Sequence, residues 1–204
     1  GLNAKSNFFI KNIKQLKEYS EFDLNIKLPN KKNQLIKKFK IPLLGIHNIK
    51  NSVAAAALAL TVGLPIKNIK KGLKNFKGVQ RRFNKIFNFN NVDFYDDYAH
   101  HPTEISSILE SVKNVYKNRK IISVFEPHRY SRIMSLKKAF SKSFINSDLV
   151  LMCPIYAAGE RKNSKFNLLN FAKMISKNSK TKVIMVKDQK ELSIFLKKNL
   201  ISNE

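Results

Sequence analysis

The chain has 204 residues, of which 43% are hydrophobic, and a formal net charge of +25. This length holds one large domain or two small ones, and the hydrophobic content is enough for a buried core. The longest apolar run, residues 53–62, is far too short to cross a bilayer, and no secretory signal opens the chain. The single cysteine, Cys153, excludes an internal disulfide and is typical of a reducing cytoplasm. We therefore expect a cytoplasmic protein without a membrane partner.

The positive charge by itself would suggest nucleic acid or another anionic surface as a partner. However, lysines are spread along nearly every segment of the chain. The aromatic residues are mostly Phe at core-like spacing, and they are not interleaved with basic residues as in RNA-binding surfaces. We therefore expect no nucleic-acid partner, and we interpret the charge as favouring small anions such as nucleotides. A non-catalytic binding module that uses its basic surface is the alternative.

Arginine is scarce against this lysine background, and its positions are clustered. Three short clusters contain Arg81, Arg82, Arg129, Arg132 and Arg161. A guanidinium can bind a carboxylate or a phosphate through two parallel hydrogen bonds, which the ammonium group of lysine cannot do. The clusters are therefore candidate anion-binding sites.

Taken in chain order, the first part of the sequence predicts strands followed by helices. Residues 22–28 alternate between apolar and polar, as in a half-buried strand. Further extended runs lie at 8–13 and 35–44, with a polar turn at 29–33, so this part is predicted to be an antiparallel sheet edge. A helix from Asn48 stops at Gly63 and Pro65, and a second helix covers residues 66–76.

From residue 78 onward, extended runs lead into strands that alternate with helices. The predicted order is extended runs at 82–89 and 92–96, a helix from Pro102, a strand at 120–125, a helix at 131–144, a strand at 149–153, a helix at 167–175, a strand at 183–186 and a helix at 189–200. This order is typical of an α/β fold with a parallel, doubly wound sheet, whose ligands bind at the carboxyl ends of the strands. We place the domain boundary near residue 78, between segments 1–77 and 78–204.

Three polar clusters directly follow predicted strands. They are Asp96-Asp97-Tyr98-Ala99-His100-His101-Pro102, Glu126-Pro127-His128-Arg129-Tyr130-Ser131-Arg132 and Tyr156-Ala157-Ala158-Gly159-Glu160-Arg161. Arg129 and Arg132 lie three residues apart at a helix start, where they and the helix N-terminus could hold a carboxylate or a phosphate. Helix capping by aspartate with solvated histidines, and a pair of solvated arginines, are the simpler alternatives. No zinc site is expected, because Cys153 stands alone and no third ligand has a suitable spacing.

A fourth cluster lies upstream, in Gly45-Ile46-His47-Asn48-Ile49-Lys50-Asn51 at the start of the alanine-rich helix. Asn48 and Asn51 are three residues apart and share a helix face. An asparagine amide offers a donor and an acceptor together, so it can pair with the edge of an adenine. Capping of the helix by Asn48 is the alternative.

In this order, the strings GxHNxxN, KGVxRRF, DDYAHHPTE, EPHRYSR and YAAGE resemble the Mur ligase family over nearly all of the chain. The resemblance implies a cytoplasmic, ATP- and Mg²⁺-dependent ligase of bacterial cell-wall (peptidoglycan) synthesis. ATP would activate the carboxylate of UDP-N-acetylmuramate as an acyl phosphate, which the amine of L-alanine then attacks. Residues 1–77 would be the end of the central ATPase domain, and 78–204 the Rossmann-like C-terminal domain. A ligase of the same family that recycles murein peptide is the alternative.

The resemblance also implies roles for individual residues. Arg82, Asp97 and His100 are expected to be catalytic, with Arg82 at the terminal phosphates of ATP and Asp97 at the ribose or as an anchor of the closed domain. The nucleotide is expected to contact His47, Asn48, Asn51, Arg82 and Asp97, with Asn48 on the adenine. The amino-acid pocket is expected to contain Tyr98, His100, Arg129, Arg132, Tyr156 and Glu160, with the arginines receiving the carboxylate of alanine.

The chain also departs from the family pattern. It contains no GxxxxGK[ST] phosphate loop, and the family's upstream glutamate and histidine that hold magnesium have no counterpart. The last strand of the family's C-terminal domain would follow the final residue, Glu204. We therefore expect a piece truncated at both ends, with no metal ligand of its own and no activity by itself.

Overall fold

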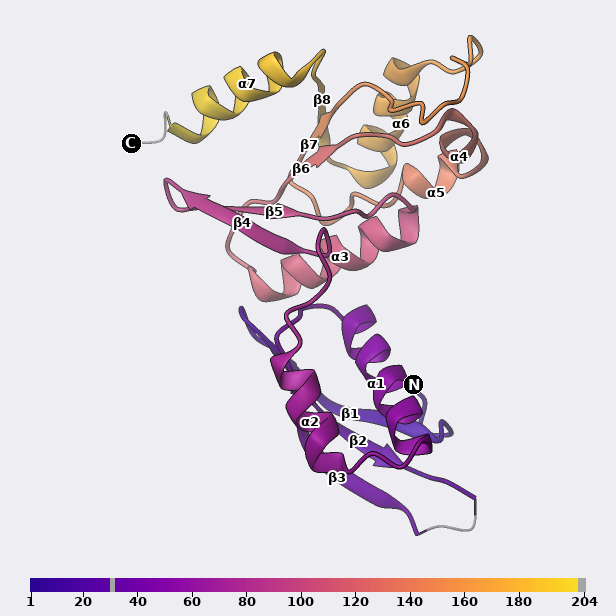
Figure 1. The fold of residues 1–204 in the computed structure, drawn as a ribbon. Coiled ribbons are helices and arrows are strands. Elements are labelled where there is room, and N and C mark those ends of the chain that lie inside the picture. The colour runs from indigo at the N-terminus through magenta and orange to yellow at the C-terminus, as the bar shows by residue number, and fades with distance from the viewer. Residues whose placement is uncertain (30–31, 202–204) are drawn as a thin grey trace. The chain divides into compact units, whose positions relative to one another are not determined.

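The computed structural model describes residues 1–29 and 32–201 and divides into two compact units (Figure 1). The first unit comprises Gly1–Gln80 with Asn114–Tyr116, and the second comprises Arg81–Lys113 with the chain from Lys117 onward. Residues 30 and 31 of the predicted polar turn, and residues 202–204, lie outside the described residues. Within the described ranges, no helix is both long enough and apolar enough to cross a membrane.

The first unit is an antiparallel sheet covered by two helices (Figure 1). The strands β1 (Phe8–Gln15), β2 (Ser20–Ile26) and β3 (Gln34–Ile41) are hydrogen-bonded in that order. Every second residue of β2 is buried, which follows from its alternation of apolar and polar side chains. Helices α1 (Ile46–Thr61) and α2 (Ile66–Asn75) add Ile49, Val53, Ala56 and Ile69 to the core of this sheet. The predicted antiparallel sheet and the two helices after it are confirmed.

The second unit begins with a hairpin that is separate from its parallel sheet. Strands β4 (Asn84–Phe89) and β5 (Val92–Asp96) pair antiparallel with each other. Asn90 and Asn91 connect them with φ of 45° and 56°, a conformation that two-residue hairpin turns require and that asparagine tolerates. A two-residue connection can join only antiparallel strands, because parallel strands need a long crossover. The extended runs at 82–89 and 92–96 therefore form this hairpin.

The predicted parallel sheet is confirmed in β6 (Ile122–Phe125), β7 (Leu149–Met152) and β8 (Lys182–Met185), which are hydrogen-bonded in that order. The helices of this unit are α3 (Pro102–Val115), α4 (Tyr130–Ser135), α5 (Lys137–Phe140), α6 (Leu168–Ser179) and α7 (Gln189–Ile201). Ile133 of α4, Phe140 of α5 and Phe171 of α6 belong to one buried core cluster. This is the arrangement that right-handed crossovers between strands adjacent in chain order produce.

The prediction of one helix over residues 131–144 is wrong. Leu136, with φ of −110°, separates α4 from α5, and α5 ends at Phe140. The hydroxyl of Ser141 donates to the carbonyl oxygen of Lys138, and that of Ser143 donates to the carbonyl oxygen of Phe140, each at 2.8 Å. Such serine bonds compete with the helical hydrogen bonds of the backbone. The segment therefore continues as turns into the buried Phe144.

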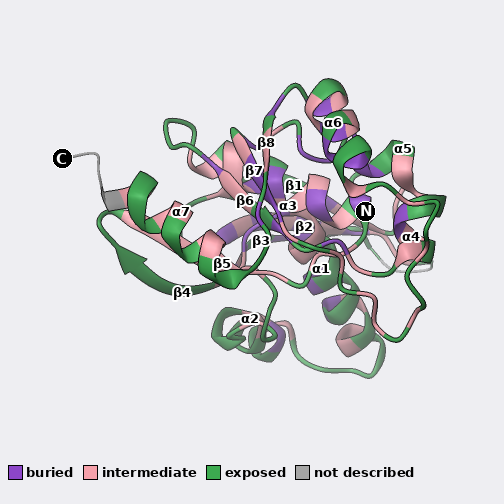
Figure 2. Ribbon diagram, turned by 90° about the horizontal axis from the view of Figure 1, so that it is seen from above, coloured by how far each residue is buried: buried purple, intermediate pink, exposed green. Residues whose placement is uncertain are grey.

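The core of the second unit is aromatic. The rings of Phe125 and Phe144 lie 5.0 Å apart, and those of Phe140 and Phe171 lie 6.2 Å apart. Figure 2 shows that buried residues concentrate on β7 and α6, whereas β4 is exposed along nearly its whole length. This core fixes β6 and β7, and hence the points from which the loops after these strands start.

We expect Phe171→Ala to lower the free energy of unfolding of the second unit by about 3–5 kcal/mol, because Phe171 is fully buried in this core. Leu169→Ala, on the same helix, is the matched control. Leu169 is 50% exposed, so its replacement should change that free energy by no more than about 0.5 kcal/mol. A denaturant titration read through the amide NMR signals of α6 measures both. Equal losses for the two variants would contradict this account of the core.

Candidate functional site

Loops that follow β6 and β7 are hydrogen-bonded to each other at the carboxyl end of the parallel sheet. His128 and Tyr156 form a parallel bridge. The backbone N–H of Arg129 donates to the carbonyl oxygen of Tyr156, and that of Tyr156 donates to the carbonyl oxygen of Pro127, both at 2.9 Å. The two predicted polar clusters thus form one structural piece.

The loop between β5 and α3 reaches the same place. The ring centroids of Tyr98 and His100 are 4.8 Å apart, those of His100 and His128 are 6.1 Å apart, and those of His128 and Tyr156 are 5.3 Å apart. We call Tyr98, His100, His128 and Tyr156 the ring row. The guanidinium of Arg81 lies over the ring of Tyr98 at one end of this row, 4.8 Å from the ring centroid. The three sequence clusters therefore meet in one row of side chains within the second unit.

Asp97 connects this loop to the arginine segment that precedes β4. One carboxylate oxygen accepts the backbone N–H of Phe83 at 2.7 Å, and the other accepts that of Ala99 at 2.6 Å. Burial raises the pKa of Asp97, against these two hydrogen bonds and the charge of Arg82, which lower it. Asp97 thus connects Phe83, which follows Arg82, to Ala99, which precedes His100.

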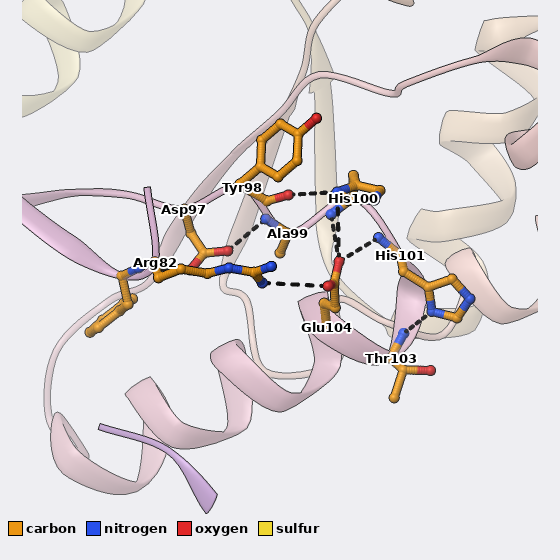
Figure 3. Close-up of polar contacts among 9 residues, drawn as sticks. Arg82, Asp97, Tyr98, Ala99, His100, His101, Thr103 and Glu104 are labelled. Atoms are coloured by element: carbon orange, nitrogen blue, oxygen red, sulfur yellow. Dashed lines mark hydrogen bonds and ion pairs between the residues drawn. The ribbon is translucent and has the colours of Figure 1, made fainter. Parts of the chain in front are cut away.

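Glu104 lies between Arg82 and His100 (Figure 3), although the sequence indicated it only as part of a helix start. Its Oε1 accepts Nη1 of Arg82 at 3.5 Å, and its Oε2 accepts the backbone N–H groups of His100 and His101 at 3.1 and 3.2 Å. Burial would raise the pKa of Glu104, but the two backbone hydrogen bonds, His100 and Arg82 outweigh it and lower that pKa overall. The sequence signal that could have found Glu104 is the spacing of a capping box, three residues after His101.

His128, at the centre of the ring row, is a second residue that the sequence did not single out. Its Nδ1 lies 3.1 Å from Nη1 of Arg132. Because a guanidinium can only donate, Nδ1 is the acceptor and the ring carries its proton on Nε2. Partial burial, then the charges of Arg132, Arg129 and His100, lower the pKa of His128 against the effect of Glu126. A neutral His128 therefore orients Arg132.

Arg129 and Glu160 show how the loops after β6 and β7 are held. Arg129 has φ of 65°, a conformation unfavourable for a residue with a side chain, and such strain is often retained at functional sites. The carboxylate of Glu160 accepts the backbone N–H of Ser131 at 3.0 Å and also accepts its hydroxyl hydrogen. One N–H of the helix N-terminus, which the sequence predicted as part of a candidate anion site, is thus already bonded. An anion at this helix start would rely on the guanidinium groups, and Glu160 connects the two loops.

The predicted nucleotide residues His47, Asn48 and Asn51 lie in the first unit, at the start of α1. Gly45, with φ of 95°, precedes the helix, and no side chain caps this start. The amide nitrogen of Asn48 donates to the carbonyl oxygen of Leu44 at 2.7 Å. Asn48 therefore lies in the first turn with its amide oriented by the backbone, and the alternative that Asn48 caps the helix is wrong.

Metal ligands do not cluster in the part of the chain that the structure describes. No group of three or more His, Cys, Asp or Glu side chains within residues 1–29 and 32–201 is placed to hold a metal ion. The side chains of the ring row and its arginines instead suit planar and anionic ligands.

We expect the stability of the second unit to fall as the pH is lowered through the range in which His128 titrates. The unfolded chain binds a proton at His128 from about pH 6.5 downward, whereas the folded pKa is lower, so protonation favours unfolding. His128→Gln, which keeps an acceptor for Arg132, should remove this part of the loss. Denaturant titrations at about pH 7.5 and about pH 5.5 measure it. The same pH dependence in both proteins would contradict the predicted role of His128.

All three clusters that form the ring row lie in a segment that matches a known protein family. The family described as "Mur ligase, glutamate ligase domain" matches residues 81–199. The UDP-N-acetylmuramate–L-alanine ligase of Pelagibacter ubique is 57% identical over all 204 residues of this chain, which cover 44% of that protein. The enzyme of the same name from Rickettsia rickettsii is 47% identical over 144 residues, or 69% of this chain and 30% of that protein. The chain thus spans less than half the length of these relatives.

Solved structures of ligases from the same family have the same fold as this chain. UDP-N-acetylmuramate-alanine ligase MurC from Thermotoga maritima superposes with a TM-score of 0.71 at 25% identity, covering 94% of this chain and 40% of that one. A murein peptide ligase from Psychrobacter arcticus superposes with a TM-score of 0.60 at 20% identity, covering 94% and 38%. At that identity the second likeness concerns the fold alone.

Proposed function

This chain belongs to the Mur ligase family, and on that premise we propose that it is part of an ATP-dependent ligase that joins L-alanine to UDP-N-acetylmuramate. Residues 1–77 are proposed as the end of the central ATPase domain, and 78–204 as the C-terminal domain. The reaction is proposed to take place in the cytoplasm. The observation that carries the proposal is the ring row, in which side chains from three separate loops meet. Arg132 is hydrogen-bonded to His128 of this row, and the backbone N–H of Arg129 is hydrogen-bonded to Tyr156.

The amino-acid pocket is proposed at this ring row. Alanine offers little apolar surface, so its carboxylate and its amine must supply most of its binding. A guanidinium that binds a carboxylate contributes about 1.5–3 kcal/mol per charge-assisted hydrogen bond. Arg132 is already oriented by His128, and Arg129 lies one turn earlier in the chain, at the start of α4. These two groups are proposed to receive the carboxylate.

The phosphate end is proposed at Arg82, with Asp97 as its support. ATP, when bound, supplies the phosphoryl group that activates the muramoyl carboxylate. The side chain of Arg82 is half exposed, so its guanidinium can contact an anion. Glu104 bonds both this guanidinium and the backbone N–H of His100, and it thereby keeps Arg82 next to the His100 loop. Asn48 is proposed to contact the adenine, with His47 and Asn51 beside it. Magnesium has no ligand set among the described residues, so its ligands are proposed to lie outside this chain.

We expect the 204-residue chain to show no ATP hydrolysis that depends on L-alanine and UDP-N-acetylmuramate, because it lacks a GxxxxGK[ST] phosphate loop. The same chain extended by the remainder of a relative's sequence should show it, measured as release of inorganic phosphate. Omitting L-alanine is the control and should abolish the release. An extended protein that folds and binds ATP, yet releases no phosphate with these substrates, would show the proposed function to be wrong.

In the extended protein, Arg82→Ala should lower turnover by about 100- to 10,000-fold, the effect of removing a preorganised charge at a transferring phosphoryl group. Folding should survive, because the side chain is 48% exposed. Circular dichroism checks the fold and steady-state kinetics the turnover. Near-normal turnover would exclude Arg82 from the phosphate site.

Arg129→Lys should raise KM for L-alanine much more than KM for ATP, because lysine keeps the charge but loses the two-pronged hydrogen bonding of a guanidinium. Steady-state kinetics with each substrate varied in turn measures the two constants. Equal increases would mean that Arg129 supports the closed domain and does not bind the amino acid.

A further inference from the structure

The two carboxylate oxygens of Glu104 have different partners. Oε2 accepts the backbone N–H groups of His100 and His101, whereas Oε1 faces the guanidinium of Arg82 (Figure 3). One side chain on α3 therefore contacts a residue proposed for the phosphate end and the loop proposed for the amino-acid end.

The hydrogen bonds to Oε2 of Glu104 have a structural role that is common at helix N-termini. The backbone N–H of Ile105 donates to the carbonyl oxygen of His101, so His101 directly precedes the helix. The backbone N–H of Thr103 donates to Nδ1 of His101 at 3.3 Å, while Glu104 accepts the N–H of His101 in return. This reciprocal pair is a capping box, in which glutamine serves as well as glutamate.

The same loop sets the orientation of the His100 ring. Nδ1 of His100 lies 2.8 Å from the carbonyl oxygen of Tyr98, which can only accept. The ring proton is therefore on Nδ1, and Glu104 Oε2 lies 3.7 Å from that nitrogen. In the tautomer that carries its proton on Nδ1, Nε2 is an acceptor, which is what the ammonium group of an amino acid requires.

The contact between Oε1 of Glu104 and the guanidinium of Arg82 is not one that stabilises the fold. Its partner Arg82 is 48% exposed and the atoms are 3.5 Å apart, a geometry that contributes little to folding free energy. A capping box does not need it, because Oε2 makes both backbone bonds. What the contact does provide is a direction for a guanidinium that would otherwise sample many rotamers.

We propose that Glu104 is a positioning residue: its carboxylate aims the guanidinium of Arg82 and holds the loop that carries His100, so that the two ends of the site keep a fixed relation. This inference rests on the proposed function for the roles of Arg82 and His100. Asp97 gives the same two segments a second link through the backbone N–H groups of Phe83 and Ala99. The link through Glu104 is the one that reaches a functional side chain directly.

Two replacements of Glu104 separate the role of Oε2 at the helix start from the role of Oε1 at Arg82. Glu104→Gln keeps an oxygen for the backbone N–H groups but removes the charge that attracts Arg82. Glu104→Ala removes both. Glu110→Gln removes the same charge from an exposed position on the same helix and is the matched control.

NMR of the isotope-labelled 204-residue chain tests the contacts without any substrate. In Glu104→Gln the guanidinium signals of Arg82 should move to the positions of free arginine, while the ring nitrogens of His100 keep the Nδ1–H pattern. In Glu104→Ala both should change, and in Glu110→Gln neither should. Unchanged Arg82 signals in Glu104→Gln would mean that Glu104 only caps α3, and the proposal would be wrong.

Kinetics of the extended ligase tests the consequence. Glu104→Gln should lower kcat about ten- to a hundredfold, the scale of a misplaced catalytic group, with KM for L-alanine unchanged. In an Arg82→Ala background it should have no further effect, because its partner is gone. Fully additive losses would overturn the proposal. Absence of L-alanine-dependent turnover in the unmutated ligase would instead refute the proposed function, while the NMR result would still decide whether Glu104 aims Arg82.

Discussion

The site depends on one geometric constraint, the parallel pairing of β6 with β7. Parallel strands end at the same edge of their sheet, so the loops that follow them start side by side. Here they are also hydrogen-bonded to each other through His128, Arg129 and Tyr156. Residues separated by the whole of α4 and α5 along the chain thereby become neighbours. Both strands are anchored by the buried aromatic side chains beneath the sheet.

Carboxylates organise the arginines of this site. Asp97 holds the backbone beside Arg82, Glu104 faces its guanidinium, and Glu160 holds the start of the helix that contains Arg132. In a chain with a net charge of +25, nearby positive charges favour the ionised form of each such carboxyl group. Asp97 and Glu160 thus hold segments that carry arginines, and Glu104 contacts a guanidinium directly. Ion pairs as exposed as that of Arg82 add little stability, so their value lies in geometry.

The pKa shifts of these groups reflect the balance between burial and their hydrogen-bond partners. The pKa of Asp97 is raised by burial, whereas the pKa of Glu104 is lowered because four donors or positive groups outweigh its burial. His128 has a lowered pKa and accepts a hydrogen bond from Arg132. The lowered pKa values of Glu104 and His128 favour the acceptor forms that their partners require, whereas burial of Asp97 works against its ionised form.

The sequence by itself determined the local elements and the identity of the reactive clusters. Alternation in β2, the two-residue connection at Asn90 and Asn91, and the order of strands and helices after Pro102 are properties of neighbouring residues. Only the tertiary structure decided the break at Leu136 and the partners of Glu104, His128 and Glu160. Two of these depend on long-range contacts: the guanidinium at Glu104 comes from 22 residues earlier, and Ser131 lies 29 residues from Glu160. Local periodicity carries no information about such distances, because they are set by how the sheet and its core bring the loops together.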